Sequence, residues 1–167
     1  MTGGSGNGTV VGNGTVVGIG VDAVDLHRFR DTLVRRPRMS TRLFTESERA
    51  YASRAVDPTA RLATRFAAKE ATMKALGVGL GAFAFIDVEV VRSGLDAPFL
   101  VLTGGAAELA ARAGVVRWHL SLTHTDLVAM ASVLAERDPA PSAGASTGNP
   151  AGAPTGNGAG APTENGA

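Results

Sequence analysis

The sequence contains no cysteine, which excludes disulfide bonds and thiol catalysis. Its three histidines show no metal-ligand spacing, so a zinc site is not expected either. Aromatic residues make up only 5% of the chain, and no stacking platform for nucleic-acid bases is visible. No serine lies in a nucleophile-elbow context, which argues against a hydrolase triad. The chain also lacks a charged leader with an apolar core and any apolar run of membrane-spanning length, so we expect a cytoplasmic protein.

Lysine is scarce as well, and its placement is informative. Of the 16 basic residues only two are lysines, Lys69 and Lys74, and both lie in the segment Arg65-Phe-Ala-Ala-Lys-Glu-Ala-Thr-Met-Lys-Ala-Leu-Gly77. On a helix, Glu70 and Lys74 lie one turn apart among small residues that allow a ligand or another backbone to approach closely. An ammonium group is a compact point charge that differs from a guanidinium fork. The segment therefore indicates a functional site, although an ordinary ion pair between Glu70 and Lys74 would explain the same spacing.

The two ends of the chain have a composition unlike the middle. Residues 1–15 are rich in Gly and Asn, and residues 138–167 consist mostly of Ala, Gly, Pro, Thr and Asn in repeated units. Such segments bury too little apolar surface to offset the entropy of ordering. We expect a disordered extension at 1–15, a folded domain at 16–137 and a disordered tail at 138–167, with both ends dispensable for activity.

Hydrophobic periodicity and turn signals predict the elements of this domain. Capping signals at Asp25, at Thr45–Glu48 and at Asp57-Pro58 predict helix starts, and Gly77 predicts the end of the long helix. Alternating apolar residues predict strands, with Ile86, Val88 and Val90 facing inward in one of them. In chain order we expect a strand at 16–24, a helix at 25–36, a short helix from 45, a long helix at 57–76, a hairpin at 84–92 and 98–103, a helix at 104–114, and strands at 117–123 and 127–134. The sequence predicts an α+β fold with a small, mainly antiparallel sheet packed on a long helix.

The first predicted strand carries a carboxylate on an otherwise bare face. Gly18, Gly20 and Asp22 share one parity of the strand, and the glycines leave room for something bulky to lie against it. A bulge or a crossing helix would also explain the two glycines. Asp22 and Glu70 together suit Mg²⁺, which takes one or two carboxylates along with water and phosphate oxygens.

Other residues would complete such a site. Lys69 and Lys74 would neutralise phosphates, and the glycine-rich loop after Gly77 would let backbone approach a ligand. His124 follows a predicted strand and either contacts a ligand or is an ordinary turn histidine.

A basic patch lies between residues 27 and 42, where six arginines accompany a single acid, Asp31. Such a patch suits an acidic protein, a nucleic acid or an anionic lipid surface, and a solvated arginine face is the plain alternative. The arginines are Arg28, Arg30, Arg35, Arg36, Arg38 and Arg42.

These motifs, taken in order, resemble those of the small-type 4′-phosphopantetheinyl transferases, the holo-acyl-carrier-protein synthase family. The matching segments span residues 16–135. They are Gly18-Ile-Gly-Val-Asp22, Arg28, Phe44-Thr-Glu-Ser-Glu48, the segment from Arg65 to Gly77, and His119-Leu-Ser-Leu-Thr-His124.

The resemblance implies an enzyme of lipid metabolism and fatty acid biosynthesis that transfers 4′-phosphopantetheine from coenzyme A to a serine of an apo acyl carrier protein, releasing adenosine 3′,5′-bisphosphate. It implies Asp22 and Glu70 as Mg²⁺ ligands, with Lys74 beside them as a third catalytic residue. It also implies a homotrimer with active sites at subunit boundaries, and it leaves open which group takes the serine proton.

The same resemblance implies where the two substrates bind. Coenzyme A would contact Lys69, Lys74, Gly79, Thr123 and His124, and the carrier protein would contact Arg28 and His27. The resemblance implies that the protein binds neither a membrane nor a nucleic acid.

The chain departs from the family pattern at three positions. Val78 stands where the family has threonine in the loop after the long helix, Ala23 where a larger aliphatic residue is usual, and His27 where a base such as lysine is common. The alternatives to a transferase are a nucleic-acid-binding module that uses residues 27–42 and a metal-dependent pyrophosphate hydrolase.

Overall fold

The structure, a computed structural model, describes residues 15–92 and 97–139. The predictions for the extension up to residue 14, for the hairpin turn at 93–96 and for the tail from residue 140 lie outside the described residues. In chain order the elements are β1 (Thr15–Asp25), α1 (Leu26–Arg35), α2 (Arg38–Leu43), α3 (Glu46–Ala52), α4 (Thr59–Ala75), the 3₁₀ helix η1 (Phe85–Asp87), β2 (Val88–Val91), β3 (Phe99–Leu102), α5 (Gly104–Arg112), β4 (Arg117–His124) and β5 (Val128–Arg137).

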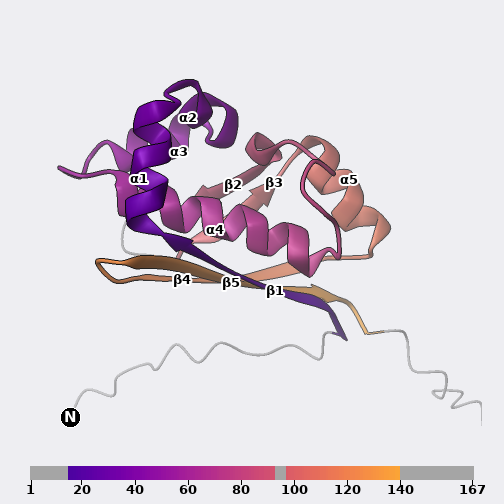
Figure 1. Ribbon diagram of the computed structural model, residues 1–167. Helices are drawn as coiled ribbons and strands as arrows, with labels where there is room; N and C mark the ends of the chain where they lie inside the picture. The colour runs from indigo at the N-terminus through magenta and orange to yellow at the C-terminus, as the bar shows by residue number, and fades with distance from the viewer. Residues whose placement is uncertain (1–14, 93–96, 140–167) are drawn as a thin grey trace, which may run out of the picture.

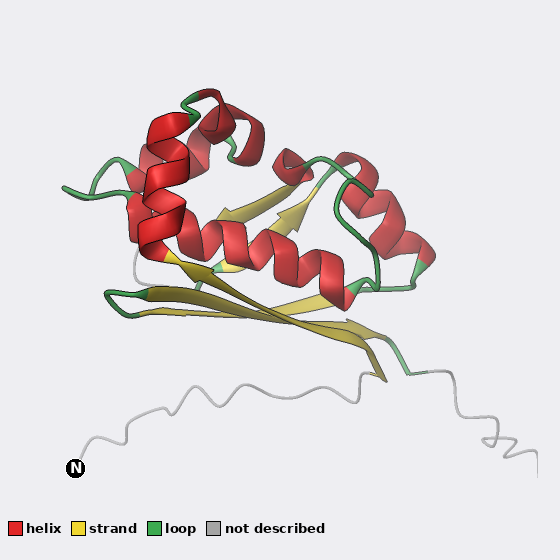
Figure 2. Ribbon diagram, in the orientation of Figure 1, coloured by secondary structure: helices red, strands yellow, loops and turns green. Residues whose placement is uncertain are grey.

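The long helix α4 lies across one face of a three-stranded antiparallel sheet (Figures 1 and 2). The sheet has the strand order β1-β5-β4, and β2 and β3 form a separate antiparallel hairpin, in which β2 contacts α4 and β3 contacts β4. Helices α1, α2 and α3 gather near one end of α4, and α5 lies near the other (Figure 1). This arrangement confirms the predicted α+β fold with a small antiparallel sheet packed on a long helix, and the predicted hairpin forms a second sheet of its own. None of the helices in the described part of the chain is both long and apolar enough to cross a bilayer.

Two glycines of β1 allow α4 to lie directly against the strand. A Cβ atom at Gly18 or Gly20 would overlap the carbonyl oxygen of Ala75 or Ala71 on the helix. The bare strand face therefore holds a crossing helix, the alternative that the sequence had left open. Asp22 lies on the same face, next to the point where α4 crosses, so the close packing decides where its carboxylate points.

The ends of α4 follow the predicted signals. Asp57 Oδ1 accepts a hydrogen bond from Thr59 N at 2.9 Å at the start of the helix. At the other end Gly77 has a φ of 68°, and the N–H groups of Gly77 and Val78 donate to the carbonyls of Lys74 and Met73. These two bonds form a Schellman motif, in which the apolar residue after the glycine packs against the helix. Val78 and Met73 belong to the same core cluster, which explains an apolar side chain at position 78.

The caps of two further helices are also as predicted. Asp25 caps α1 by accepting from Arg28 N at 2.9 Å, and Thr45 and Glu48 form the reciprocal capping box of α3. Helix α2 was not predicted, and it starts directly after Pro37.

The prediction for Ile86 is wrong. The chain is a 3₁₀ helix there, which leaves Ile86 47% exposed, whereas Val88 and Val90 face inward as expected.

The inner face of the three-stranded sheet and α4 share one core of small residues. Ala67, Ala68 and Ala71 of the helix pack against Ala131 and Val133 of β5. Within residues 15–92 and 97–139 no element covers the outer face of the same sheet, which carries exposed apolar side chains, among them Ile19, Val21 and Met130.

Candidate active site

The structure brings Asp22 and Glu70 together, although 47 residues lie between them in the sequence. Asp22 sits near the end of β1 and Glu70 near the middle of α4, and both line a cavity of about 260 Å³ that Arg28 also borders. The Asp22 side chain is only 10% exposed. Lys74, one turn after Glu70, donates from Nζ to Asp22 Oδ1 at 2.9 Å and to the carbonyl of Val21 at 2.9 Å. Lys74 therefore pairs with Asp22 rather than with Glu70.

The surroundings of Glu70 change its ionisation. Burial raises the pKa of Glu70 above its usual range, the neighbouring carboxylate of Asp22 raises this pKa further, and Lys74 opposes the rise. A carboxylate pair with one nearby ammonium group has an excess of negative charge, which a cation would balance.

One oxygen of this pair lacks a hydrogen-bond partner. Oδ2 of Asp22 is buried and has no donor among the described residues. Buried carboxylate oxygens are almost always satisfied, and an unsatisfied one requires an explanation. Because hard divalent cations prefer oxygen ligands, Asp22 and Glu70 fit a Mg²⁺ ion. The described residues contain no cluster of three or more His, Cys, Asp or Glu.

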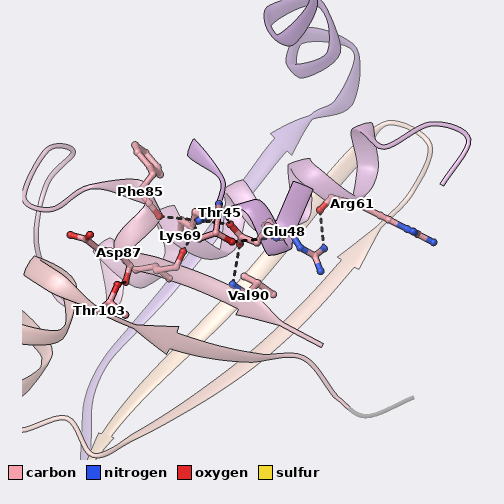
Figure 3. A network of polar contacts seen from close by, with 10 residues as sticks. Thr45, Glu48, Arg61, Lys69, Phe85, Asp87, Val90 and Thr103 are labelled. Carbon is pink, nitrogen blue, oxygen red and sulfur yellow. Dashed lines mark hydrogen bonds and ion pairs between the residues drawn. The ribbon is translucent and has the colours of Figure 1, made fainter. Parts of the chain in front are cut away.

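The structure contradicts the prediction that Lys69 contacts phosphate. The Lys69 side chain is 0% exposed, and its Nζ lies 2.7 Å from Glu48 Oε2, whose side chain is also 0% exposed. Nζ donates in addition to the carbonyl of Phe85 (Figure 3) and to that of Val88. These three acceptors use all three donors of the ammonium group. Burial lowers the pKa of Lys69, while Glu48 opposes that change. Lys69 thus belongs to the interior of the protein.

Gly79 and Lys74, both predicted to bind coenzyme A, lie close to Glu70. They line a second cavity of about 250 Å³ together with Met73, Val78 and Leu80. Glu70 borders both this cavity and the one that contains Asp22. A ligand in one cavity and a ligand in the other would therefore both lie close to the Glu70 carboxylate.

A third cavity, of about 760 Å³, has a strongly basic wall that the sequence analysis missed. His124 lines it, as do three arginines from α4 and the end of β2, namely Arg61, Arg65 and Arg92. Arg65 is 4% exposed, and its Nε is buried without a partner among the described residues. An unpaired buried guanidinium nitrogen next to a cavity suits an anionic ligand.

The positive charge around this cavity changes the pKa of Tyr51, which lies in the cavity wall. Burial on its own would raise the pKa of Tyr51, but Arg92, Arg65 and Arg61 together lower it. The guanidinium of Arg65 lies 4.1 Å from the centre of the Tyr51 ring. Arg65 is the first residue of the segment 65–77 that indicated a functional site. The position of Arg65 in that segment does not indicate that its side chain lines a cavity.

The side chains of Thr123 and His124 lie on opposite faces of the sheet, because neighbouring residues of a strand alternate between its two faces. His124 lines the basic cavity, and Thr123 lies on the outer face of the sheet with Ser121, Met130 and Ser132. The cavities beside Asp22 and Glu70 have other lining residues. Within one chain, His124 and Thr123 are thus not brought to the carboxylate pair.

The two residues predicted to contact a carrier protein lie on exposed positions of α1. Arg28 borders the cavity of Asp22 and Glu70, and His27 precedes it on the helix. Within the basic patch, Arg30 and Arg35 pair with Asp57 and Asp31. The remaining arginines of the patch, Arg36, Arg38 and Arg42, line a further cavity of about 660 Å³.

Comparison with known proteins gives a family and close relatives. The family model for the 4′-phosphopantetheinyl transferase superfamily matches residues 18–131. A holo-[acyl-carrier-protein] synthase from Frankia casuarinae is 50% identical over 118 residues, which cover 71% of this chain and 95% of the relative. One from Salinispora arenicola is 44% identical over 119 residues, with coverage of 71% and 97%.

Solved structures of similar proteins share the fold. The holo-[acyl-carrier-protein] synthase of Neisseria meningitidis is 30% identical with a TM-score of 0.68, covering 74% of this chain and 100% of the other. That of Bacillus anthracis, solved in complex with CoA (3′,5′-ADP), is 33% identical with a TM-score of 0.62, covering 74% of this chain and 98% of the other.

Proposed function

The chain belongs to the 4′-phosphopantetheinyl transferase superfamily, and from this membership we propose how its residues carry out the reaction of a holo-acyl-carrier-protein synthase. Such an enzyme transfers 4′-phosphopantetheine from coenzyme A to a serine hydroxyl of an apo acyl carrier protein. The by-product is adenosine 3′,5′-bisphosphate. The observation that carries the assignment is the meeting of Asp22 and Glu70 beside Lys74, between two cavities.

Asp22 and Glu70 are the Mg²⁺ ligands in this proposal. The buried, unpartnered Oδ2 of Asp22 and the raised pKa of Glu70 both support a cation there. When bound, Mg²⁺ neutralises charge on the pyrophosphate of coenzyme A. Lys74 holds the Asp22 carboxylate in place and leaves its ammonium group, whose side chain is 52% exposed, near the phosphates.

The two cavities that share Glu70 suit the two reactants. The carrier serine enters the cavity that Arg28 borders, and the phosphates of coenzyme A approach from the cavity of Lys74 and Gly79. The nucleophile and the leaving group then approach the transferred phosphorus from different cavities, which suits the roughly in-line arrangement of a displacement at phosphorus. In such a reaction positioning and charge neutralisation contribute most of the rate, so a covalent enzyme intermediate is unnecessary.

The basic cavity lined by Arg61, Arg65, Arg92 and His124 takes the nucleotide end of coenzyme A. Several guanidinium groups suit its phosphate groups, with which arginine forms paired hydrogen bonds. Since this cavity and the carboxylate pair have different lining residues in one chain, the complete site combines the carboxylate pair of one copy with the basic cavity of another. The homotrimer implied by the family provides such boundaries, and the uncovered outer face of β1, β5 and β4 is the surface that would be buried between copies.

The carrier protein docks on α1. Arg28 and His27 are exposed there, and the neighbouring arginines give this side of the molecule a positive charge that suits an acidic helix. Fatty acid biosynthesis in the cytoplasm is the corresponding cellular role.

The test is Mg²⁺-dependent labelling of a purified apo acyl carrier protein. With coenzyme A and Mg²⁺ present, the full chain should increase the mass of the carrier by one phosphopantetheine group, and chelation of Mg²⁺ should stop the reaction. Mass spectrometry of the carrier gives the readout. Unmodified carrier in the presence of active-site-intact enzyme, coenzyme A and Mg²⁺ would refute the proposal.

Two controls separate the alternatives. A carrier with its acceptor serine replaced by alanine should halt cleavage of coenzyme A, because only a pyrophosphate hydrolase would continue without an acceptor. Retention on DNA or RNA that weakens with salt, without any labelling of the carrier, would instead favour the nucleic-acid-binding alternative.

A further inference from the structure

The buried ion pair between Glu48 and Lys69 takes no part in the chemistry described above. Both side chains are 0% exposed, and the pair joins Oε2 and Nζ at 2.7 Å. Replacing a buried ion pair by apolar side chains of similar volume is often neutral or stabilising. Stability alone therefore does not explain why a chain with only two lysines uses one of them in its core. An apolar replacement would, however, lose the directed hydrogen bonds of the pair.

Those hydrogen bonds join three parts of the fold. Lys69 Nζ on α4 donates to the carbonyl of Phe85 at 2.9 Å and to that of Val88 at 2.5 Å, one at each end of η1. Glu48 on α3 accepts from Val90 N at 3.0 Å on β2 and from Thr45 N at 3.0 Å (Figure 3). The pair thus fixes where the chain enters η1 and β2 relative to α4.

The segment that leads into η1 is the glycine-rich loop at residues 76–84. Its outgoing end is fixed to α4 by the bond from Val78 N to the carbonyl of Met73 at 3.0 Å. Its returning end reaches Phe85, whose carbonyl is fixed to Lys69. Lys69 and Met73 lie one turn apart on α4, so the loop leaves and returns at neighbouring turns of the same helix.

The middle of the loop forms one side of the cavity beside Glu70. Gly79 and Leu80 line this cavity together with Lys74, and Leu80 is 73% exposed. Within the loop an Ala82 N–H donates to the carbonyl of Gly79 at 3.3 Å. The shape of this wall depends on the two ends of the loop, since the exposed middle packs little against the core.

We propose that Lys69 is a positioning residue for coenzyme A: it holds the returning end of the loop at 76–84, so that Gly79 and Leu80 keep the cavity beside Lys74 in the shape that binds the phosphate region of coenzyme A. Glu48 keeps the ammonium of Lys69 in line with the two carbonyls. Lys69 itself touches no substrate. This assignment rests on the proposed function, because it takes the cavity beside Lys74 as part of the coenzyme A site.

The test uses two variants of the full chain, Lys69→Met and the charge-neutral pair Glu48→Gln with Lys69→Met. The second variant leaves no buried carboxylate without a counter-ion and serves if the first does not fold. We expect the KM for coenzyme A, and its Kd measured by calorimetry without carrier, to rise about tenfold, since groups that orient a binding site are worth about that factor or more. The kcat should stay within about twofold of the parent, and hydrogen exchange at residues 78–84 should become faster.

Val133→Ala is the matched control. It removes buried volume from β5, and Val133 is 0% exposed and lies in the core cluster of the sheet. This variant should lose thermal stability without changing the KM for coenzyme A or the exchange of the loop. A general structural role for Lys69 would likewise reduce the amount of folded enzyme and the apparent kcat while leaving KM unchanged.

KM and Kd values for coenzyme A that equal those of the parent in both Lys69 variants would overturn the proposal. Faster hydrogen exchange in α4 and β2, with unchanged exchange in the loop at residues 76–84, would overturn it as well. Failure of the parent chain to label any carrier would count against the proposed function instead, and the Kd for coenzyme A and the exchange of the loop would still decide the role of Lys69.

Discussion

Glu70 is partly removed from water and lies beside the carboxylate of Asp22. Ionisation of a carboxyl group in such a place lowers the free energy of unfolding. Burial and the charge of Asp22 both raise the pKa of Glu70 above the value it has in the unfolded chain. Below the ordinary pKa of glutamate both states hold the proton, so Glu70 has no effect on stability there. As the pH rises, the unfolded state releases its proton first, and stability falls until the folded state ionises as well.

Glu70→Gln should therefore stabilise the metal-free protein at pH 7, and the gain should shrink as the pH falls through the ordinary range of glutamate. The same substitution should lower transferase activity by at least about 100-fold, because even outer groups of a metal site are worth about 10- to 100-fold. Urea unfolding at several pH values, with and without Mg²⁺, measures the first effect. Added Mg²⁺ should stabilise the parent and not the variant.

Glu108→Gln provides the matched control, since it removes the same charge from a side chain of α5 that is 74% exposed. Its free energy of unfolding should differ little from that of the parent at every pH. A difference between Glu70→Gln and the parent that does not vary with pH would contradict the raised pKa of Glu70.

The residue scale also shows what spacing in a sequence cannot decide. The two lysines of the motif looked equivalent, because both flank Glu70 on a helix of small residues. Lys74 reaches Asp22 and keeps half of its surface exposed, whereas Lys69 is covered by α3 and β2 and pairs with Glu48. Which face of α4 is covered depends on elements distant in the chain, so the periodicity of α4 alone did not distinguish the two roles.

At the scale of elements, the contact between β1 and α4 determines the geometry of the site. The helix lies so close to the strand that its carbonyl oxygens occupy the space where a Cβ would stand at Gly18 and Gly20. This contact places Asp22 of the strand beside Glu70 and Lys74 of the helix. A shift between the two elements would separate the carboxylates as well as the core.

Gly20→Ala should consequently destabilise the protein by about 3 kcal/mol or more, at or beyond the usual range for overpacking, because the rigid backbone of Ala71 cannot move away without displacing α4. Gly79→Ala is the control. A Cβ at Gly79 meets nothing within 4 Å, so this change should alter stability by no more than about 1 kcal/mol. Urea unfolding of both variants gives the comparison, and equal stability of the two would show that α4 does not press on β1.

Local signals predicted most elements, since the residues that start and stop a helix act over one turn. Asp25, the Thr45–Glu48 box and Gly77 all cap helices as their types and spacing indicated. The 3₁₀ helix at Ile86 was read as strand, because a short alternating run does not reveal where pairing with β3 ends. The basic cavity was missed for a different reason: its arginines come from α4 and the end of β2, and only the tertiary fold brings them together.

At the scale of the whole molecule, the described part of one chain leaves the outer face of the three-stranded sheet uncovered. Ile19 is 61% exposed, Val21 48% and Met130 40%, and these residues share one face of β1 and β5. Thr123 lies on this face too, and His124 lines a cavity that shares no lining residue with the two cavities beside the carboxylate pair. If copies of the chain meet through this face, residues predicted for one site are supplied by two chains, which accounts for their separation within one.

Ile19→Glu combined with Met130→Glu should therefore reduce the mass in solution from that of a trimer to that of a single chain and reduce transferase activity by at least about 100-fold, because a buried interface does not tolerate unpaired carboxylates. Light scattering after size-exclusion chromatography measures the mass, and labelling of the carrier measures activity. Val34→Glu is the matched control, since Val34 is 73% exposed on α1, away from this sheet, and its mass should equal that of the parent. A parent chain that is active as a monomer, or a double variant that keeps the parent mass, would contradict this assembly and would require His124 and Thr123 to act without a neighbouring copy.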